Sequence, residues 1–227
     1  MKKIQLIMMA SAVASLTSLT AQAQYSNPFN TTSSPFRFDY GTTTASTTAT
    51  TTWVSGPTYD AGGSALSGSA KLSWTWNHTA DGDGGAAFTA DLFGTDQNYA
   101  GSTLSFDIMV DPNSVAGGFN DYGYFQVFDR DDGYAGGPGM LNESLVGGVA
   151  TTVGTWAHVS VVLGADASTL RALTFQDYND AGRSINGPET IYIDNLTLTP
   201  VPEPSTIALA GFGGIAALLA IRRNRKS

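Results

Sequence analysis

The run Thr103-Leu-Ser-Phe-Asp-Ile-Met-Val110 decides the fold class. Large apolar side chains at Leu104, Phe106, Ile108 and Val110 alternate with other residues. A period of two is typical of a β-strand with one buried face, because successive side chains of a strand point to opposite faces. An α-helix would put these residues on two opposite sides of its axis. The run therefore predicts a strand that covers a hydrophobic core.

Further strands are predicted on both sides of this run, separated by turns rich in Gly, Asp, Asn and Pro. Phe36, Phe38 and Tyr40 alternate in the first of them, and Trp74 and Trp76 are expected in the core. Since no convincing amphipathic helix interrupts the series, the sequence predicts an all-β, two-sheet β-sandwich. The predicted segments are 36–40, 71–77, 86–93, 122–130, 156–163, 170–177 and 190–199.

The last predicted strand changes phase. Its apolar residues occupy two odd and then two even positions, Ile191, Ile193, Leu196 and Leu198. A β-bulge at Asp194-Asn195 would explain the slip and would re-aim the Asp194 side chain. In the alternative, Tyr192 and the two leucines face inward together, and the isoleucines face a second apolar layer.

The N-terminus predicts a secretory signal peptide. Lys2 and Lys3 precede an apolar run over 4–19, which is followed by Ala21-Gln-Ala23. Small residues at Ala21 and Ala23 suit signal peptidase, so cleavage is expected after Ala23. We assign residues 1–23 to a signal helix and residues 24–200 to the β-sandwich domain.

The C-terminus has three distinct parts. Pro202-Glu203-Pro204 prevents a helix from running back into the domain. Residues 207–221 form an apolar segment of 15 residues, which is shorter than the roughly 20 that span a bilayer comfortably. Four cations follow, which the positive-inside rule keeps cytoplasmic, namely Arg222, Arg223, Arg225 and Lys226. The segment predicts a short transmembrane helix.

Together these parts, residues 201–227, resemble the PEP-CTERM sorting signal of Gram-negative bacteria. The resemblance implies anchoring in the inner membrane and then processing near Pro202, Glu203 and Pro204 by an exosortase-type protease. It also implies release or attachment at the cell surface, often in bacteria that make extracellular polysaccharide. We therefore expect an exported, cell-surface or extracellular protein. The alternative for this segment is an ordinary single-span anchor.

Charge and cysteine content limit what residues 24–200 can do. The chain has 19 acidic and 11 basic residues and no cysteine. Six of the basic residues and one acidic residue lie in the two ends, so the domain carries a net charge of −13. Such a surface repels phosphate backbones, and no nucleic-acid partner is expected. It attracts cations such as Ca²⁺, and the lack of cysteine excludes disulfides.

Four segments of the middle resemble galactose-binding-like jelly rolls, a fold shared by many carbohydrate-binding modules. They are Gly68-Ser-Ala-Lys-Leu-Ser-Trp74, Tyr99-Ala-Gly-Ser-Thr-Leu-Ser-Phe-Asp-Ile108, Gly154-Thr-Trp-Ala-His-Val-Ser-Val-Val-Leu163 and Ile191-Tyr-Ile-Asp-Asn-Leu-Thr-Leu198. The resemblance implies a two-sheet jelly-roll β-sandwich that binds sugar on a concave sheet face or at loop tips. It also implies a structural Ca²⁺ near the last strand.

Sugar binding requires an aromatic ring to stack on the pyranose and planar polar groups to hold its hydroxyls. If Phe125 and Val127 take the core, their strand presents such a set outward, namely Tyr124, Gln126, Phe128 and Arg130. By the same parity, Leu173 and Phe175 point inward, which leaves Gln176 and Tyr178 facing outward. We expect the two sets to form one concave glycan-binding surface. The alternative places the two aromatic residues of the first set in the core.

Asp194 is the first candidate metal ligand, because a bulged Asp on the last strand of such folds often faces the N-terminal segment. Asp39 could join it there, and the alternative is a pair of solvated carboxylates. Asp81-Gly-Asp-Gly-Gly85 lacks the ligands of an EF-hand loop and is predicted to be a turn. A solvated loop is predicted for a third acidic group, Asp129, Asp131 and Asp132.

Threonine dominates residues 42–52. Ice binding needs regular rows of threonine across many strands, and no such repeat occurs elsewhere in the chain. We predict a flexible edge strand or a glycosylated segment.

These features predict a non-catalytic surface protein that contacts extracellular polysaccharide. His78 and His158 are the only histidines, which together with the lack of cysteine leaves few nucleophile–base pairs. The acidic residues show no spacing that selects a pair for glycoside hydrolysis. The alternatives are a structural biofilm or surface-matrix component that acts through protein–protein contacts and, third, an extracellular hydrolase.

Overall fold

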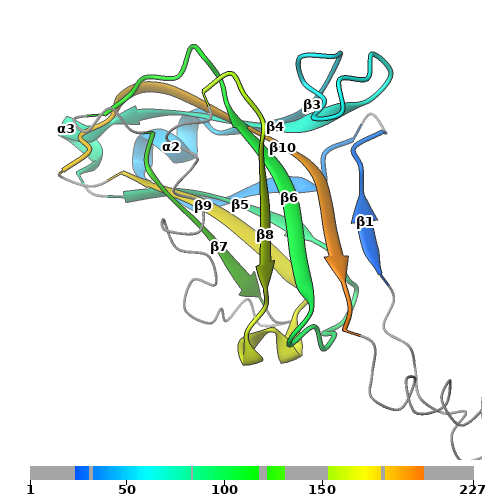
Figure 1. Ribbon diagram of the computed structural model, residues 1–227. Coiled ribbons are helices and arrows are strands. Elements are labelled where there is room, and N and C mark those ends of the chain that lie inside the picture. Colours follow the sequence, from blue (N-terminus) through cyan, green and yellow to red (C-terminus); the bar gives the residue numbers. More distant parts are fainter. Residues whose placement is uncertain are drawn as a thin grey trace, which may run out of the picture. The chain divides into compact units, whose positions relative to one another are not determined.

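Two antiparallel sheets pack face to face as a β-sandwich in the computed structural model (Figure 1). The structure describes residues 24–30, 33–82, 84–117, 122–130, 153–179 and 182–201, and Gln24–Pro200 form one compact unit. The predicted signal helix and transmembrane helix lie outside these residues, as do the predicted site residues Ala21, Ala23, Pro202, Glu203 and Pro204. None of the helices in the described ranges is long and apolar enough to span a membrane.

The two sheets differ in size. Sheet A has the strand order β3 (Thr50–Ser55), β4 (Gly68–Asn77), β10 (Asn186–Thr199), β6 (Thr103–Val110) and β8 (Ala157–Val162), with β1 (Tyr25–Asn27) also beside β10. Sheet B has the order β2 (Phe36–Gly41), β5 (Gly84–Asp91), β9 (Ala172–Asn179) and β7 (Tyr124–Arg130). Three short helices complete the described elements, α2 (Thr43–Thr48), α3 (His78–Asp81) and the 3₁₀ helix η2 (Ala165–Thr169).

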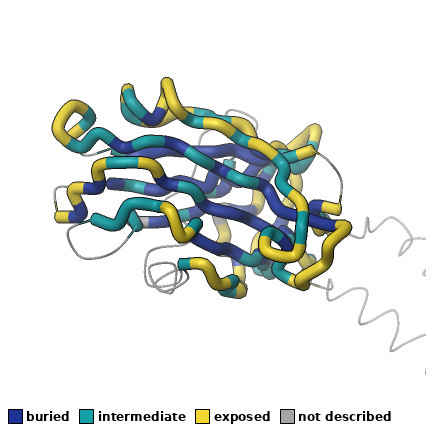
Figure 2. Tube along the Cα trace, turned by 90° about the horizontal axis from the view of Figure 1, so that it is seen from above, coloured by how far each residue is buried: buried dark blue, intermediate teal, exposed yellow. Residues whose placement is uncertain are grey.

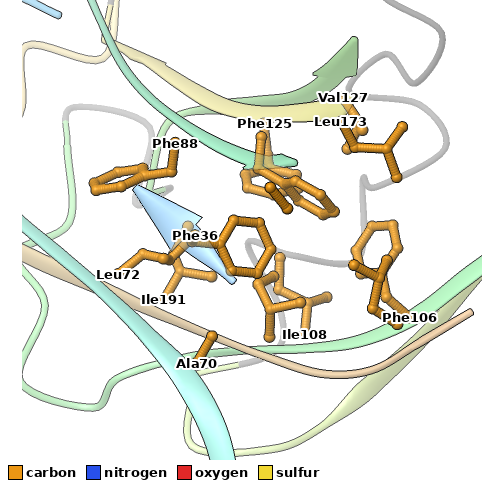
Figure 3. Close-up of a cluster of buried hydrophobic side chains, with 14 of the residues drawn as sticks. Phe36, Ala70, Leu72, Phe88, Phe106, Ile108, Phe125, Val127, Leu173 and Ile191 are labelled. Atoms are coloured by element: carbon orange, nitrogen blue, oxygen red, sulfur yellow. The ribbon is translucent and has the colours of Figure 1, made fainter. Parts of the chain in front are cut away.

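The core lies between the sheets and confirms the predicted alternation. Leu104, Phe106, Ile108 and Val110 of β6 are all fully buried. Figure 3 shows side chains of both sheets meeting, with Phe36, Phe88, Phe125, Val127 and Leu173 from sheet B and Ala70, Leu72, Phe106, Ile108 and Ile191 from sheet A. Trp74 and Trp76 belong to this core, as predicted. Buried segments run along the middle of the strands, and exposed residues gather at the connections (Figure 2).

The predicted bulge in β10 is confirmed. The register of β10 with β6 shifts between Asp194 and Thr197, and Asn195 takes a φ of 51°. Both isoleucines and both leucines of the strand are buried in the core. The alternative is wrong, because Tyr192 lies on the outer face, where its ring contacts Tyr59 at 5.1 Å between centroids.

The position of this bulge coincides with a change of neighbour. The N-terminal part of β10 pairs with β4 as far as Ile193 opposite Ala70. From Leu196 on, β10 pairs with β1 instead, starting opposite Asn27. The extra residue therefore lies where one edge of β10 passes from one partner strand to another.

The threonine-rich segment is only partly a strand. Residues 50–55 form edge strand β3, as predicted, but residues 43–48 form helix α2, which the sequence analysis missed. Thr42 caps the helix by accepting a hydrogen bond from the Ala45 N–H at 3.3 Å. Asp81, far along the chain, accepts from the Thr44 N–H and hydroxyl at 3.1 and 2.9 Å. These contacts satisfy the first turn and outweigh the weak helix propensity of threonine.

Candidate functional site

The outer face of sheet B collects polar and aromatic side chains from all four strands. The predicted parity of β7 and β9 is confirmed, because the opposite set lies in the core, namely Phe125, Val127, Leu173 and Phe175. The alternative for Phe128 is wrong, since its half-buried side chain lies outside the core and beside Arg130. We call this surface the sheet B face.

Backbone register brings the two predicted outward sets together. In the pairing of β7 with β9, Tyr124 lies opposite Tyr178 and Gln126 opposite Gln176. The Gln126 Nε2 donates a hydrogen bond of 2.8 Å to the Gln176 Oε1. This bond uses one donor and one acceptor. Gln176 is only 8% exposed, so the half-buried Gln126 is the member of the pair that a ligand can reach more easily.

Gly85 of β5 makes room for this amide pair. A Cβ atom at Gly85 would lie 2.3 Å from the Gln176 Nε2, closer than atoms can approach. The small residue on β5 therefore leaves room for the Gln176 Nε2 on one side of β9, while the Gln176 Oε1 accepts from Gln126 of β7 on the other side.

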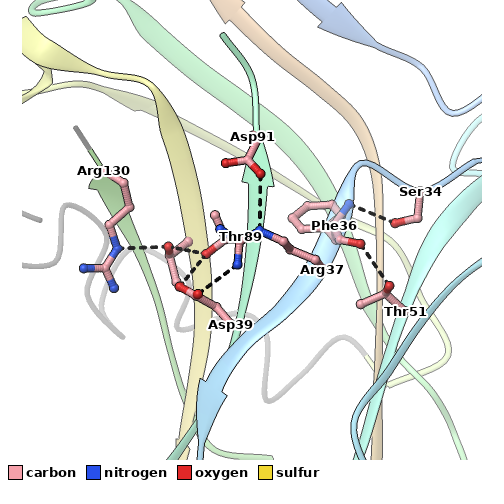
Figure 4. Close-up of polar contacts among 9 residues, drawn as sticks. Ser34, Phe36, Arg37, Asp39, Thr51, Thr89, Asp91 and Arg130 are labelled. Atoms are coloured by element: carbon pink, nitrogen blue, oxygen red, sulfur yellow. Dashed lines mark hydrogen bonds and ion pairs between the residues drawn. The ribbon is translucent and has the colours of Figure 1, made fainter. Parts of the chain in front are cut away.

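A chain of hydrogen bonds crosses the whole sheet B face (Figure 4). The Arg130 Nε donates to the Thr174 hydroxyl at 3.0 Å, the hydroxyls of Thr174 and Thr89 are 2.7 Å apart, and the Thr89 hydroxyl donates to the Asp39 Oδ2 at 3.0 Å. A cation on β7 is thus linked to a carboxylate on β2 through both middle strands. Both threonines are fully buried.

Arg130 also lies beside two aromatic rings. Its guanidinium carbon is 5.7 Å from the ring centroid of Tyr40 and 5.6 Å from that of Phe128, within the range of a cation–π contact. The Arg130 Nη2 donates to the Tyr40 hydroxyl at 3.1 Å. Arg130 therefore connects the two edge strands of sheet B.

Tyr40 is a residue of this face that the sequence analysis missed. The alternation of Phe36, Phe38 and Tyr40 predicts one common face, but the β2–β5 register shifts between Phe38 and Tyr40. Asp39 is the extra residue, so it and Tyr40 both reach the outer face, and Tyr40 is 42% exposed. The sequence pattern does not indicate this bulge, because Tyr40 continues the alternation of aromatic residues that Phe36 and Phe38 begin.

Asp39 does not join Asp194, so the predicted common metal site is wrong. Asp39 lies on the outer face of sheet B, where its Oδ1 pairs with the Arg37 Nη1 at 2.9 Å, and the Arg37 Nε also pairs with Asp91 at 3.2 Å. Asp194 lies on β10 in sheet A, on the opposite side of the sandwich.

Asp194 itself is almost fully buried beside the bulge. Its Oδ2 accepts from the Ala61 N–H at 2.8 Å and its Oδ1 from the Asn195 N–H at 2.7 Å. Burial, together with the nearby charges of Asp60 and Asp107, raises the pKa of Asp194 to about 6 against the lowering effect of these hydrogen bonds. The carboxylate ties the loop after β3 to the bulge.

A calcium site at Asp194 stays a prediction. Within the described ranges, no three or more His, Asp and Glu side chains come together in a group that could hold a metal ion. The hydrogen bonds of Asp194 are those of a structural carboxylate, so these residues alone do not supply the several oxygen ligands that Ca²⁺ needs.

The other acidic candidates have structural surroundings. Asp81 ends helix α3 and accepts from Thr44 and from the Asn77 N–H, and Gly82 follows with a φ of 63°. The turn predicted over 81–85 is shorter than expected, because Gly84 and Gly85 already belong to β5, and Asp83 lies outside the described residues. Asp129 is 4% exposed and not solvated, because its parity in β7 turns it inward. Its predicted companions Asp131 and Asp132 lie outside the described residues.

The β-sandwich is similar to solved carbohydrate-binding modules. A family 11 carbohydrate-binding module from Clostridium thermocellum in complex with a β-1,3-1,4-mixed-linked tetrasaccharide has a TM-score of 0.50 and 14% identity, covering 81% of this chain and 99% of that one. The family 11 module of the cellulosomal cellulase Lic26A-Cel5E of Clostridium thermocellum has a TM-score of 0.49 and 13% identity, covering 80% and 97%. At 14% identity, the likeness to the first of these two modules shows a shared fold.

A third structure represents carbohydrate-binding modules of the β-sandwich superfamily. Its TM-score is 0.46 at 17% identity, covering 72% of this chain and 56% of that one, so this chain matches little more than half of its length.

The tail matches a sequence family. The profile described as the PEP-CTERM protein-sorting motif matches residues 200–226, which shows the predicted sorting motif. This motif implies export and membrane anchoring before exosortase processing, and then a cell-surface or extracellular location. No curated protein matches the chain.

Proposed function

We propose that this protein is an exported, exosortase-processed, non-catalytic protein whose sheet B face contacts extracellular polysaccharide. Signal peptidase would remove residues 1–23 during export. The observation that carries the proposal is the amide pair of Gln126 and Gln176 on the face where Arg130 lies beside the rings of Tyr40 and Phe128.

The chemistry of this face suits sugar. Each sugar hydroxyl both donates and accepts hydrogen bonds, and carboxamides offer both functions in one plane. Tyr40 is exposed on the same face, where its ring can cover the C–H face of a pyranose. The fold's likeness to a module solved with a bound tetrasaccharide is consistent with this assignment.

The rigidity of the face supports binding. Because the chain from Arg130 to Asp39 fixes side chains of all four strands, little side-chain entropy remains to be lost when a ligand binds. The carboxylates of Asp39 and Asp91 both pair with Arg37. These ion pairs engage both carboxylates with a side chain of the same face, which favours a binding role over hydrolysis.

The test is binding of the processed protein to an array of neutral and acidic polysaccharides. We expect binding that weakens about tenfold in Gln126→Ala/Gln176→Ala, since the loss of one or two hydrogen bonds costs about 1–2 kcal/mol. Ser160→Ala, on exposed β8 of the other sheet, is the matched control and should bind as the wild type does.

Two results would count against the proposal. One is no binding to any polysaccharide. The other is equal binding by the wild type and the double variant, which would show that the sheet B face does not contact the polysaccharide. Self-association without glycan would instead favour the structural surface-matrix role.

A further inference from the structure

A hollow of about 200 Å³ lies on the outer face of sheet A, on the side of the sandwich away from the sheet B face. Strands β4 and β10 and the turn after β6 supply its walls, which are Lys71, Asp111, Asn113, Ser114, Pro188 and Thr190. Ligand pockets for drug-sized molecules measure about 300–1,000 Å³. This smaller hollow therefore suits a single small ring.

Lys71 gives the hollow a cation without a fixed partner. It is the only lysine between residues 24 and 200. The ion pairs found among the described residues involve Arg37 and His158, not Lys71. Its ammonium group can therefore donate hydrogen bonds to a ligand without first breaking an ion pair.

Asp111 supplies an oriented acceptor opposite this cation. Its Oδ2 accepts from the Tyr192 hydroxyl at 2.5 Å, and its Oδ1 accepts from the Asn113 N–H and Nδ2 at 2.8 and 2.9 Å. Burial raises the pKa of Asp111, but these hydrogen bonds and the charge of Lys71 hold it below its ordinary value. Because its pKa is lowered, the carboxylate is ionised at neutral pH. An ionised carboxylate can accept about four hydrogen bonds, and Asp111 accepts three here, so it can still accept one from a ligand.

The remaining walls are fixed by hydrogen bonds between the turn and β10. The Ser114 Oγ accepts from the Thr190 N–H at 3.0 Å and donates to the Thr190 carbonyl at 3.3 Å. The Thr190 hydroxyl in turn lies 2.8 Å from that of Ser73. Hydrogen bonds therefore hold both the turn after β6 and strand β10 in place at the hollow.

We propose that this hollow binds one uncharged pyranose unit, whose adjacent hydroxyls accept from the Lys71 ammonium and donate to the Asp111 carboxylate. A hydroxyl can do both at once. The two charges cancel each other, so the hollow itself gives the carboxylate of a uronate no net attraction. The net charge of −13 on residues 24–200 repels an anion, so the site selects neutral sugars.

This site goes beyond the proposed function, because it lies on the other sheet and does not require the sheet B face to bind. If both faces bind, each domain holds two sugar chains at once. Such a bivalent domain cross-links a polysaccharide matrix and gains affinity by multivalency.

The uniqueness of Lys71 makes the site testable by amine footprinting. The full chain would be acetylated with N-hydroxysuccinimide acetate, and acetylation of the peptide that contains Lys71 would be followed by mass spectrometry. The probes are the methyl glycosides of glucose, galactose and mannose, with glucuronate as the charged comparison. About 100 mM of each suits a site of millimolar Kd.

We expect at least one neutral glycoside to slow acetylation of Lys71 threefold or more. In Asp111→Asn, the glycoside should no longer slow the acetylation of Lys71 relative to the rate that the same variant shows without sugar. If that variant does not fold, Lys71→Met is added to the double variant Gln126→Ala/Gln176→Ala, and the triple variant should lose the saturation-transfer NMR signal that the double variant gives with the same glycoside. The double variant Gln126→Ala/Gln176→Ala should keep full protection, which separates this site from the sheet B face.

The proposal is overturned if no neutral glycoside slows the reaction, or if glucuronate protects Lys71 better than all of them. Protection that persists in Asp111→Asn would likewise overturn it, since Asp111 would then not hold the sugar.

Discussion

The hydroxyls of Thr89 and Thr174 lie 2.7 Å apart at the centre of the sheet B face and are both fully buried. The Thr89 hydroxyl proton is committed to Asp39, so the proton between the two threonines must come from Thr174. Thr174 can then only accept from Arg130, as the geometry shows. All bonds of the chain run in one direction, from cation to carboxylate, and in such a chain each bond strengthens the next.

The first prediction concerns this pair. Thr174→Val should lower the free energy of unfolding by about 1–3 kcal/mol, because it removes the hydroxyl that accepts from the Arg130 Nε–H and donates to the Thr89 oxygen. The double variant Thr89→Val/Thr174→Val should cost less than the sum of the single variants. Urea denaturation measures both values, with Ser160→Ala as the surface control. Strictly additive losses would show that the hydroxyls are not coupled.

The second prediction concerns Gly85. In Gly85→Ala the new Cβ displaces the Gln176 amide and breaks its hydrogen bond to Gln126, so polysaccharide binding should weaken about fivefold, the equivalent of one hydrogen bond. Gly94→Ala is the matched control, since a Cβ there meets no atom within 4 Å. Titration calorimetry gives the affinities. Unchanged polysaccharide binding by Gly85→Ala would show that the amide pair of Gln126 and Gln176 does not take part in recognition.

The contrast between the two bulges shows what the sequence alone can predict. In β10 the apolar residues themselves change phase, from Ile193 to Leu196, and both sets are buried, so the bulge follows from the pattern. In β2 the residue after the bulge is Tyr40, whose ring suits either a core or a binding face. The pattern there is unbroken, and only the pairing with β5 reveals the shift.

Long-range contacts explain the rest of what was missed. Helix α2 depends on contacts with Asp81, which lies 37 residues from Thr44 along the chain. The helix propensity of the local sequence does not predict such a contact. The parity of β7 and β9 did predict that Gln126 and Gln176 face outward. Their direct contact depends on the register of strands β7 and β9, which the sequence does not specify.

The third prediction is a pH dependence at Asp194. Burial raises its pKa from the ordinary 3.8 to about 6, so between about pH 4 and 6 the folded protein binds this proton more tightly than the unfolded chain does. The contribution of Asp194 to stability must then rise as the pH falls through this window. The gain that Asp194 contributes is on the order of 2–3 kcal/mol.

The check for Asp194 compares urea denaturation of wild type and Asp194→Asn at several pH values. Asparagine cannot titrate, and its Nδ2 cannot accept one of the two backbone N–H groups that Asp194 binds. The stability difference should therefore grow in favour of the wild type from about pH 7 to pH 4.5. A difference that does not vary with pH would contradict the raised pKa.

The fourth prediction tests calcium at the same residue. Calcium coordination by Asp194 predicts a higher Tm with excess Ca²⁺ than with EDTA, because a ligand that binds only the folded state stabilises it. A bound cation would also offset the repulsion from Asp60 and Asp107, so the pH dependence described above should shrink in Ca²⁺. Asp194→Ala should remove the effect of Ca²⁺ on the Tm. Asp81→Ala removes the acceptor of the Thr44 N–H in the first turn of helix α2, so it should lower the Tm but leave the effect of Ca²⁺ unchanged. Equal melting of the wild type in Ca²⁺ and EDTA would rule out a stabilising Ca²⁺ site at Asp194.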